Sequence, residues 1–225
     1  MAEGACLEIK AVIFDLDGTL TDTEPATEES VRRCLEKHQI VPDAGDRRFC
    51  AGRSWQSIFR YLLDKYKLPL SMQEIEGIIY SAYLDVLKSG ITPVRGSVEA
   101  VKALSKEFKL AVVSGSSRQQ VDYTLESIGI RQYMTVVLTC EMFAKGKPDP
   151  EGYLKAIGLL GLTPRECVIF DDSTPGVTAA KASGAFTVGI SGLNRYDQDV
   201  SSAHAVVQDL AGITPAWIRS SCVAG

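Results

Sequence analysis

Two acidic residues, separated by one other residue, follow a short apolar run near the N-terminus. Asp15 and Asp17 come directly after residues 11–14 (AVIF), so a strand ending there would carry both carboxylates to its carboxyl edge. Carboxylates that close repel each other unless a cation lies between them, and hard divalent cations such as Mg²⁺ favour oxygen ligands. The pair therefore predicts a divalent-cation site, and an ordinary acidic turn is the alternative.

Two further segments carry groups that bind phosphate. Ser114 and Gly115 begin the sequence SGSS, where hydroxyls, backbone N–H groups and a helix N-terminus would meet. Lys147 lies in KGKPDP, a loop in which Pro148 and Pro150 restrict the backbone and can hold one lysine in place. Taken alone, the first segment is also typical of a helix N-cap, and the second of solvated surface lysines.

A second acidic pair, Asp171 and Asp172, ends a later apolar run and precedes STPG. If both runs belong to one parallel sheet, the two pairs meet at the same edge, and a bound metal would relieve their repulsion. Each signal is weak by itself, but acids at two strand ends, a hydroxyl turn and a proline-framed lysine do not often coincide. Together they favour a phosphate- and metal-binding site.

The elements that must position these residues follow from the hydrophobic pattern. Five apolar runs predict buried parallel strands at 11–14, 110–113, 135–138, 168–170 and 186–190. Helical patterns separate the last four, with inner faces made by Val121, Leu125 and Ile128, by Tyr153, Ile157 and Leu160, and by Val177, Ala180 and Ala182. Alternating strands and helices predict an α/β fold with a doubly wound, Rossmann-like parallel sheet.

The interval between the first two strands is too long for one crossover helix. Its pattern predicts helices from Pro25 to His38, over 54–66 and over 72–88. We therefore expect an α/β core of residues 1–23 and 91–225, with an inserted helical cap domain at 24–90. Because ligands of open α/β sheets bind at the carboxyl ends of the strands, such a cap would cover the site. The two chain crossings, 21–25 and 89–93, would act as hinges.

The composition narrows the classes of function. A net charge of −4 over 225 residues provides no broad basic field for nucleic acid or an anionic membrane. The six cysteines are scattered without a CxxC pair, and no apolar run approaches the length of a membrane span. We expect a cytoplasmic monomer with reduced cysteines whose partner is a small phosphorylated metabolite.

Four segments, in order, resemble the haloacid dehalogenase-type hydrolase superfamily, in the branch of β-phosphoglucomutase and sugar-phosphate phosphatases. They are DLDGTLTDTE, VVSGSSRQQV, KGKPDPEGYLKAIG and VIFDDSTPGVTAAKASGA, and they extend over nearly the whole chain. The resemblance implies a central first strand, with the second and third strands on one side and the fourth and fifth on the other.

The resemblance also implies roles for individual residues. Asp15 matches the nucleophile and Asp17 the general acid and base, while Ser114, with Gly115 beside it, and Lys147 match the phosphate-binding groups. Mg²⁺ would be held by Asp15, by the backbone carbonyl of Asp17 and by Asp172, with Asp171 acting through water. The implied reaction is hydrolysis of a small phosphomonoester, such as a sugar or polyol phosphate, through an aspartyl-phosphate on Asp15. Asp17 disfavours dehalogenation, because the dehalogenases lack this second acid.

Two departures from the mutases favour water as the phosphate acceptor. Thr27 stands where they carry a histidine, and Trp55 where they carry an arginine. Arg53, Trp55 and Gln56, which follow Gly52, form either a loop that enters the site or a helix start with Trp55 packed in the cap. A β-phosphoglucomutase-like phosphomutase stays the alternative, and a receiver-like or non-enzymatic phospho-signalling protein is disfavoured by the motif order and the insertion.

Overall fold

Six parallel strands form the central sheet. The computed structural model describes residues 8–50, 53–193 and 197–222, and the strands lie in the order β5-β4-β1-β6-β7-β8. Their bounds are β1 Ala11–Phe14, β4 Lys109–Val113, β5 Val136–Leu138, β6 Cys167–Asp171, β7 Phe186–Ile190 and β8 Ala205–Val207. The predicted doubly wound α/β fold and the predicted strand order, with the first strand central, are both confirmed.

The sixth strand, β8, was not predicted. It pairs with β7 over only Ala205–Val207 and lies at the edge of the sheet, where Val206 is exposed. So short a segment has too few positions for a strand period to stand out from its surroundings. Its pairing depends on where β7 places it.

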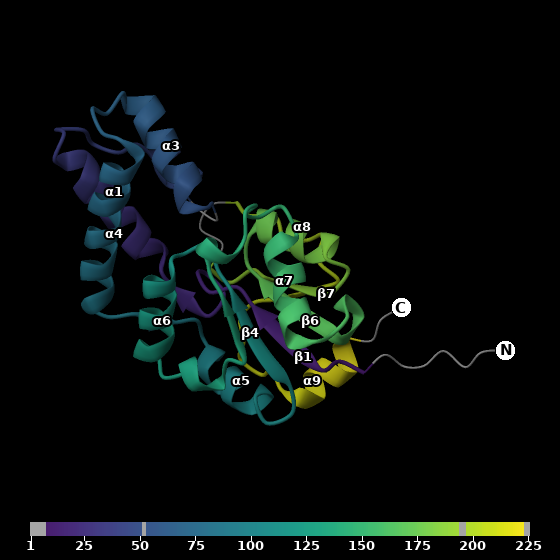
Figure 1. The fold of residues 1–225 in the computed structure, drawn as a ribbon. Helices are drawn as coiled ribbons and strands as arrows, with labels where there is room; N and C mark the ends of the chain where they lie inside the picture. The colour runs from purple at the N-terminus through teal and green to yellow at the C-terminus, as the bar shows by residue number, and fades with distance from the viewer. Residues whose placement is uncertain (1–7, 51–52, 194–196, 223–225) are drawn as a thin grey trace.

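Helices cover both faces of this sheet (Figure 1). Alternate residues of β1 belong to different cores: Val12 and Phe14 face one cluster, and Ala11 and Ile13 the other. The first cluster is closed by α5 (Ser97–Leu104), α6 (Arg118–Ser127) and α9 (Pro215–Ser221), and the second by α7 (Glu151–Leu160) and α8 (Thr174–Ala182). Burial on both sides explains why each central strand is an uninterrupted apolar run.

One predicted helix face needs correction. Val177 and Ala180 of α8 are buried as expected, but Ala182 is exposed and Ala179 is buried instead. At 100° per residue, Ala182 lies about 140° around the helix from Val177, so the two cannot share a narrow face. The faces predicted for the two preceding helices hold, although Ile128 is only partly buried.

Four helices between β1 and β4 form a second body with its own apolar core, here called the helical unit. They are α1 (Glu24–Glu36), α2 (Ala44–Cys50), α3 (Trp55–Tyr66) and α4 (Met72–Lys88). The fourth helix runs over the predicted 72–88, whereas α1 ends at Glu36 rather than at His38, and α2 was not predicted. The helical unit lies beside the carboxyl end of the sheet (Figure 1).

Local chemistry explains where these helices begin. Pro25 stands in the first turn of α1, where its missing N–H costs nothing. The Ser54 hydroxyl accepts a hydrogen bond from the Ser57 N–H, so Ser54 caps α3 rather than starting it. Ser71 and Glu74 form a reciprocal capping box at α4.

The chain enters and leaves the helical unit through two adjacent segments. β2 (Thr21–Asp22) pairs antiparallel with β3 (Thr92–Pro93) to form a separate two-stranded sheet. These short strands lie within the predicted hinge segments, so the helical unit is joined to the core at one place. Movement about these segments stays a prediction.

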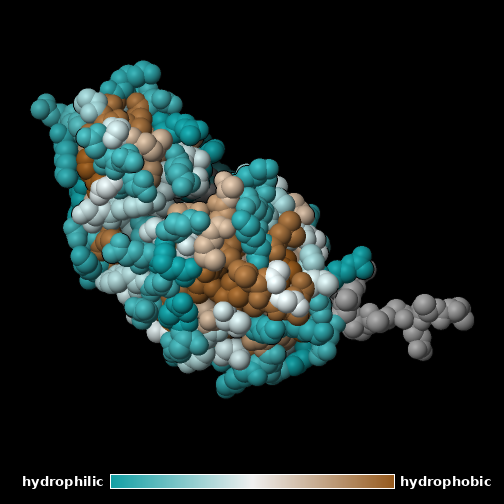
Figure 2. Space-filling model, viewed as in Figure 1, coloured by the Kyte–Doolittle hydropathy of each residue, from teal (hydrophilic) through white to brown (hydrophobic). Residues whose placement is uncertain are grey.

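The surface is mostly hydrophilic on the side shown in Figure 2, with apolar atoms gathered over the central part of the core. Within the described ranges, no helix has both the length and the apolar character that a membrane span requires. The five described cysteines are free thiols, and Cys6 lies outside the described residues.

Candidate active site

The two predicted acidic pairs meet at one edge of the sheet because β1 and β6 are neighbours. Asp15 follows β1 and Asp171 ends β6. The Asp15 N–H donates to the carbonyl of Phe170, the residue before Asp171, at 2.9 Å. One carboxylate oxygen each of Asp15, Asp171 and Asp172 lies within 4.8 Å of the others. All three side chains are largely buried, so their charges are poorly screened by water.

Lys147 enters this cluster from the loop before α7. Its Nζ lies 2.5 Å from Asp15 Oδ1 and 2.6 Å from Asp171 Oδ2. Lys145, two residues earlier in the same loop, is exposed and pairs with Asp149 at 3.6 Å. Both lysines border the cavity, but it is Lys147 that contacts the acidic cluster.

One lysine does not balance three carboxylates. Burial, with smaller contributions from Asp171 and Asp17, raises the pKa of Asp15 to about 7 even though Lys147 opposes the shift. Burial, with smaller contributions from Asp171 and Asp15, also raises the pKa of Asp172 well above its usual value. For Lys147 the attraction of Asp15 and Asp171 outweighs burial and raises its pKa. A divalent cation with oxygen ligands fits this donor set, because it would supply the missing positive charge.

Asp171 is the most tightly held of the three acids. It is fully buried and accepts hydrogen bonds from Tyr153 Oη at 2.5 Å and from the Ser173 N–H and hydroxyl at 2.9 Å each, besides the contact with Lys147. A side chain at Gly176 would overlap its carboxylate, since an added Cβ would lie 2.0 Å from both oxygens. The sequence around Asp171 is therefore shaped to fix one carboxylate.

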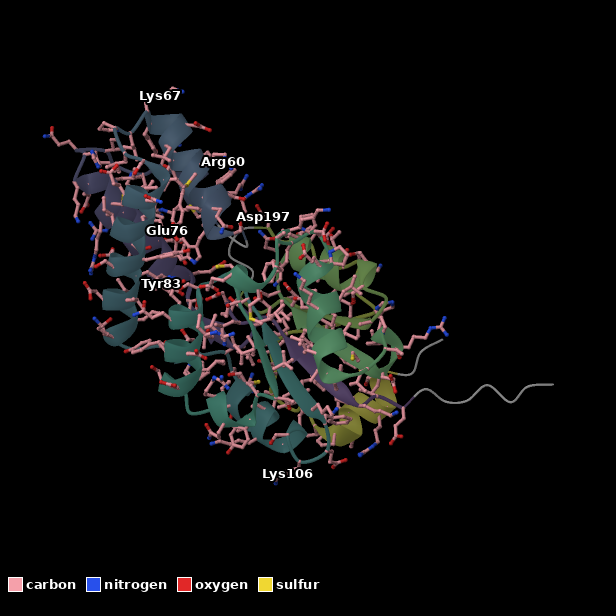
Figure 3. All side chains as sticks on the ribbon, in the orientation of Figure 1. Arg60, Lys67, Glu76, Tyr83, Lys106 and Asp197 are labelled. Carbon is pink, nitrogen blue, oxygen red and sulfur yellow. The ribbon has the colours of Figure 1, made fainter. Side chains whose placement is uncertain are left out.

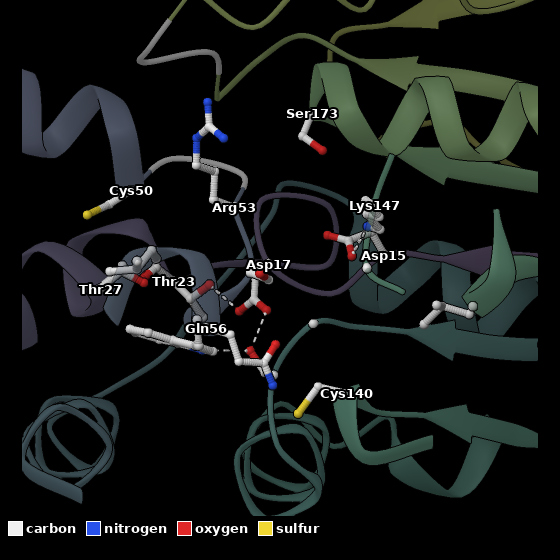
Figure 4. A pocket seen from close by; sticks show the side chains of 18 of the residues that line it. Asp15, Asp17, Thr23, Thr27, Cys50, Arg53, Gln56, Cys140, Lys147 and Ser173 are labelled. Carbon is white, nitrogen blue, oxygen red and sulfur yellow. Dashed lines mark hydrogen bonds and ion pairs between the residues drawn. The ribbon is translucent and has the colours of Figure 1, made fainter. Parts of the chain in front are cut away.

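Asp17 points away from this cluster and toward the helical unit (Figure 4). Its Oδ1 accepts from Thr23 Oγ1 at 2.5 Å and from Tyr83 Oη at 3.3 Å. Its Oδ2 accepts from Ser116 Oγ at 3.0 Å and from Ser114 Oγ at 3.2 Å. The four hydroxyls use the four lone-pair positions that a carboxylate offers, which holds Asp17 in one orientation.

Both interpretations of the serine loop are correct, for different residues. Ser117 caps α6, with its hydroxyl accepting from the Gln120 N–H, while Ser114 and Ser116 turn toward Asp17. Gly115 lines the cavity. Among the described residues other than its chain neighbours, the nearest atom to a Cβ added there would be Ser54 Cα at 4.0 Å, so these residues leave space for a ligand.

A cavity of about 230 Å³ opens between the sheet edge and the helical unit. The core contributes Asp15, Asp17, Gly115, Lys147 and Asp172 to its wall. The helical unit contributes polar and charged groups as well, among them Glu28, Arg47, Arg53 and Gln56. Thr27, in the position where the mutases carry histidine, also lines it.

The three residues predicted at the cap loop have different places. Arg53 is exposed, with its guanidinium 4.4 Å from the centre of the Phe49 ring. Trp55 begins α3 and is buried among aromatic rings, as one of the two interpretations required, yet it also borders the cavity. Gln56 is exposed at the cavity wall, and Gly52 lies outside the described residues.

The sequence did not single out several groups that contact the predicted residues. Thr23 lies within the first motif, and Thr19, whose hydroxyl donates to Asp172 at 2.8 Å, does so as well, so the motif itself contained that signal. Tyr83 and Tyr153 look like ordinary members of an apolar helix face. Only the tertiary structure brings their hydroxyls to Asp17 and Asp171.

The chain is similar to a known family and to known proteins. Residues 12–190 match the family model described as haloacid dehalogenase-like hydrolase. Validoxylamine A 7'-phosphate phosphatase of Streptomyces hygroscopicus subsp. limoneus is 29% identical over 91% of this chain and 95% of its own. A phosphorylated carbohydrates phosphatase of Thermotoga maritima is 31% identical over 78% of this chain and 82% of its own.

Solved structures show the same fold. The crystal structure of β-phosphoglucomutase from Clostridium difficile superposes with a TM-score of 0.82 at 22% identity, over 95% of this chain and 97% of that one. The names of the sequence relatives support the predicted enzyme class, a phosphatase. From the family model and these relatives together, the chain belongs to the haloacid dehalogenase-like hydrolases.

Proposed function

We propose that the protein is a Mg²⁺-dependent phosphatase that hydrolyses a small phosphorylated carbohydrate through an aspartyl-phosphate on Asp15. The observation that carries the proposal is the buried contact of Asp15 with Lys147 at the base of a cavity that Asp17 also borders. A nucleophile, a fixed positive charge and a proton carrier thus surround one space of about 230 Å³.

The first step is transfer of the phosphoryl group to Asp15. An oxygen of Asp15 attacks phosphorus, the bond from phosphorus to the alcohol oxygen breaks, and Asp17 gives its proton to the departing alcohol. In the second step Asp17 takes a proton from water, the water oxygen bonds to phosphorus, and the bond to Asp15 breaks. The contact with Asp15 Oδ1 places Lys147 beside the negative charge of the transferred group.

Proton transfer requires the hydroxyls around Asp17 to rearrange. Four donors can all point at Asp17 only while it is ionised, so one must turn away or accept when Asp17 carries a proton. Ser114 is the natural candidate, because its single hydrogen is the one that a bound phosphate would compete for.

The metal belongs to the same proposal. Asp15 and Asp172 would hold Mg²⁺ directly, with the backbone carbonyl of Asp17 and with Asp171 acting through water, as the family resemblance implies. When bound, the ion neutralises charge on the phosphate oxygens and on the clustered acids. We also propose that residues 24–90 act as the cap of this site, since their separate core and their contribution to the cavity wall support that division.

The phosphorylated carbohydrate class is supported by the names of the two relatives and by the polar groups of the helical unit that line the cavity. The test is phosphate release from hexose, polyol and nucleoside monophosphates, with Mg²⁺ or with chelator. Release should require Mg²⁺ and should be lost in Asp15→Ala and strongly reduced in Lys147→Ala. Lys102→Ala, which changes an exposed lysine of α5 outside the cavity lining, serves as the control. Near-normal turnover by Asp15→Ala would overturn the mechanism. Isomerisation of a sugar phosphate that needs a bisphosphate activator would instead identify a phosphomutase.

A further inference from the structure

Trp55 contacts two residues, Ser116 and Tyr83, and each of them donates a hydrogen bond to a different oxygen of Asp17. Its indole Nε1 lies 3.3 Å from Ser116 Oγ, which is 3.0 Å from Asp17 Oδ2. Its ring also packs edge-on against the Tyr83 ring at 5.2 Å, and the Tyr83 hydroxyl is 3.3 Å from Asp17 Oδ1. Figure 3 shows Tyr83 at the end of the helical unit that faces the sheet.

The direction of the hydrogen bonds follows from the chemistry of the groups. An indole N–H can only donate, so Ser116 Oγ must accept from Trp55. The single hydrogen of Ser116 is then directed to Asp17, and a hydroxyl that accepts one bond donates a stronger one. The chain of donors runs from the helical unit, through the core loop, to the proton carrier.

Trp55 is not available as a stacking surface for a sugar. Only 5% of the residue is exposed, and its ring faces Phe59 at 5.8 Å and meets Tyr80 and Tyr83 edge-on. The part of Trp55 that leaves this aromatic cluster is Nε1, and it meets Ser116. An aromatic residue at this place therefore acts through its hydrogen bond.

We propose that Trp55 is a positioning residue for Asp17, acting through Ser116 and Tyr83. Packing of Trp55 in the helical unit then links the place of that unit to the orientation of the Asp17 carboxylate. This inference rests on the proposed phosphatase activity. It predicts that the Trp55–Ser116 contact supports protonation of the leaving alcohol more than it supports substrate binding.

The test compares leaving groups in Ser116→Ala, Trp55→Phe and the double variant. An alkyl phosphate needs a proton from Asp17, whereas p-nitrophenyl phosphate releases a stable phenolate without one. In Ser116→Ala, which removes a hydrogen bond to a charged group, kcat/KM for a polyol phosphate should fall about tenfold or more, and that for p-nitrophenyl phosphate less than about threefold. Trp55→Phe should show a smaller loss with the same bias, and the double variant should be no worse than Ser116→Ala.

A second readout does not depend on activity. In a Trp217→Phe background Trp55 is the remaining one of the two tryptophans, and its emission should change in Ser116→Ala because the indole loses its acceptor. Trp217 belongs to α9, away from the cavity, so Trp217→Phe is also the control for kinetics. Unchanged emission, equal losses on both substrates, or additive losses would each overturn the proposal. No phosphate release by the wild type would refute the proposed function instead, and the emission would still test the contact.

Discussion

Replacing Asp46 by alanine should destabilise the helical unit by about 1–3 kcal/mol, the cost of leaving buried hydrogen-bond donors without their acceptor. Asp46 is 1% exposed and accepts from Lys65 Nζ at 2.7 Å, Tyr66 Oη at 2.5 Å and Tyr61 Oη at 3.0 Å. It also accepts from the Asp43 N–H at 2.7 Å, which completes the start of α2. Alanine would leave one ammonium and two hydroxyls without this acceptor.

The matched control is Asp85→Ala on α4. Asp85 also pairs with a lysine, Lys88 at 3.1 Å, but both side chains are more than half exposed. An exposed pair of this kind contributes about 0–1 kcal/mol, so the two variants should differ several-fold in their effect. Urea unfolding followed by Trp55 fluorescence in the Trp217→Phe background reports on the helical unit that contains both sites.

The pKa of Asp46 determines how its contribution to stability changes with pH. Burial opposes the charged form of Asp46, but hydrogen bonds from Lys65 and Tyr66 outweigh it and hold the pKa of Asp46 below its usual value. Stability from such a group is present above the unfolded pKa of about 4 and is lost as the pH falls below it. The difference between wild type and Asp46→Ala should therefore shrink below about pH 4. Equal effects of Asp46→Ala and Asp85→Ala at pH 7 would show that this buried network does not stabilise the helical unit.

Three further predictions concern the site and its surroundings. Gly18→Ala should abolish phosphate release, because the added Cβ would lie 2.1 Å from Asp172 Oδ2 in a backbone with φ of +89°. The control is Gly158→Ala on α7, where the added Cβ meets open space. It should retain activity and raise the free energy of unfolding in urea by up to about 1 kcal/mol. Lys147→Met should be less stable than wild type in chelator, since Asp15 and Asp171 have then lost their buried cation. Added Mg²⁺ should therefore raise the Tm of this variant more than that of wild type. An equal rise in Tm would contradict the idea that Lys147 and Mg²⁺ neutralise the same acids. The pKa of His204 is lowered by burial and by Lys181, and its Nδ1 accepts a hydrogen bond from the Thr187 N–H at 3.0 Å. His204 therefore contributes stability above about pH 6.5 that is lost on acidification. His204→Gln should flatten this part of the curve of unfolding free energy against pH.

Much of the fold was determined by short-range pattern. Buried parallel strands must be apolar on both sides, so β1, β4, β6 and β7 are visible as runs in the sequence. Proline in the first turn locates the start of α1, and serine at the N-cap locates the starts of α3 and α4, because these residues dispense with or satisfy backbone N–H groups. Strand-end acids and the KGKPDP loop are read in the same way, since each is local in the chain.

The sequence failed where a residue's role depends on a partner far along the chain. The adjacent residues Ser116 and Ser117 have different roles in the same loop. Ser117 caps α6, whereas Ser116 contacts Asp17 and the indole of Trp55, which is 61 positions away. Tyr83 and Tyr153 have the spacing of core residues, and their hydroxyls become functional only when packing places a carboxylate at their tips. The sequence by itself therefore determined the α/β fold and the family, and it singled out the acids and the lysine that the structure brings together. The tertiary structure decided which hydroxyls hold those acids, because hydrogen bonds between distant segments leave no periodic trace in either one.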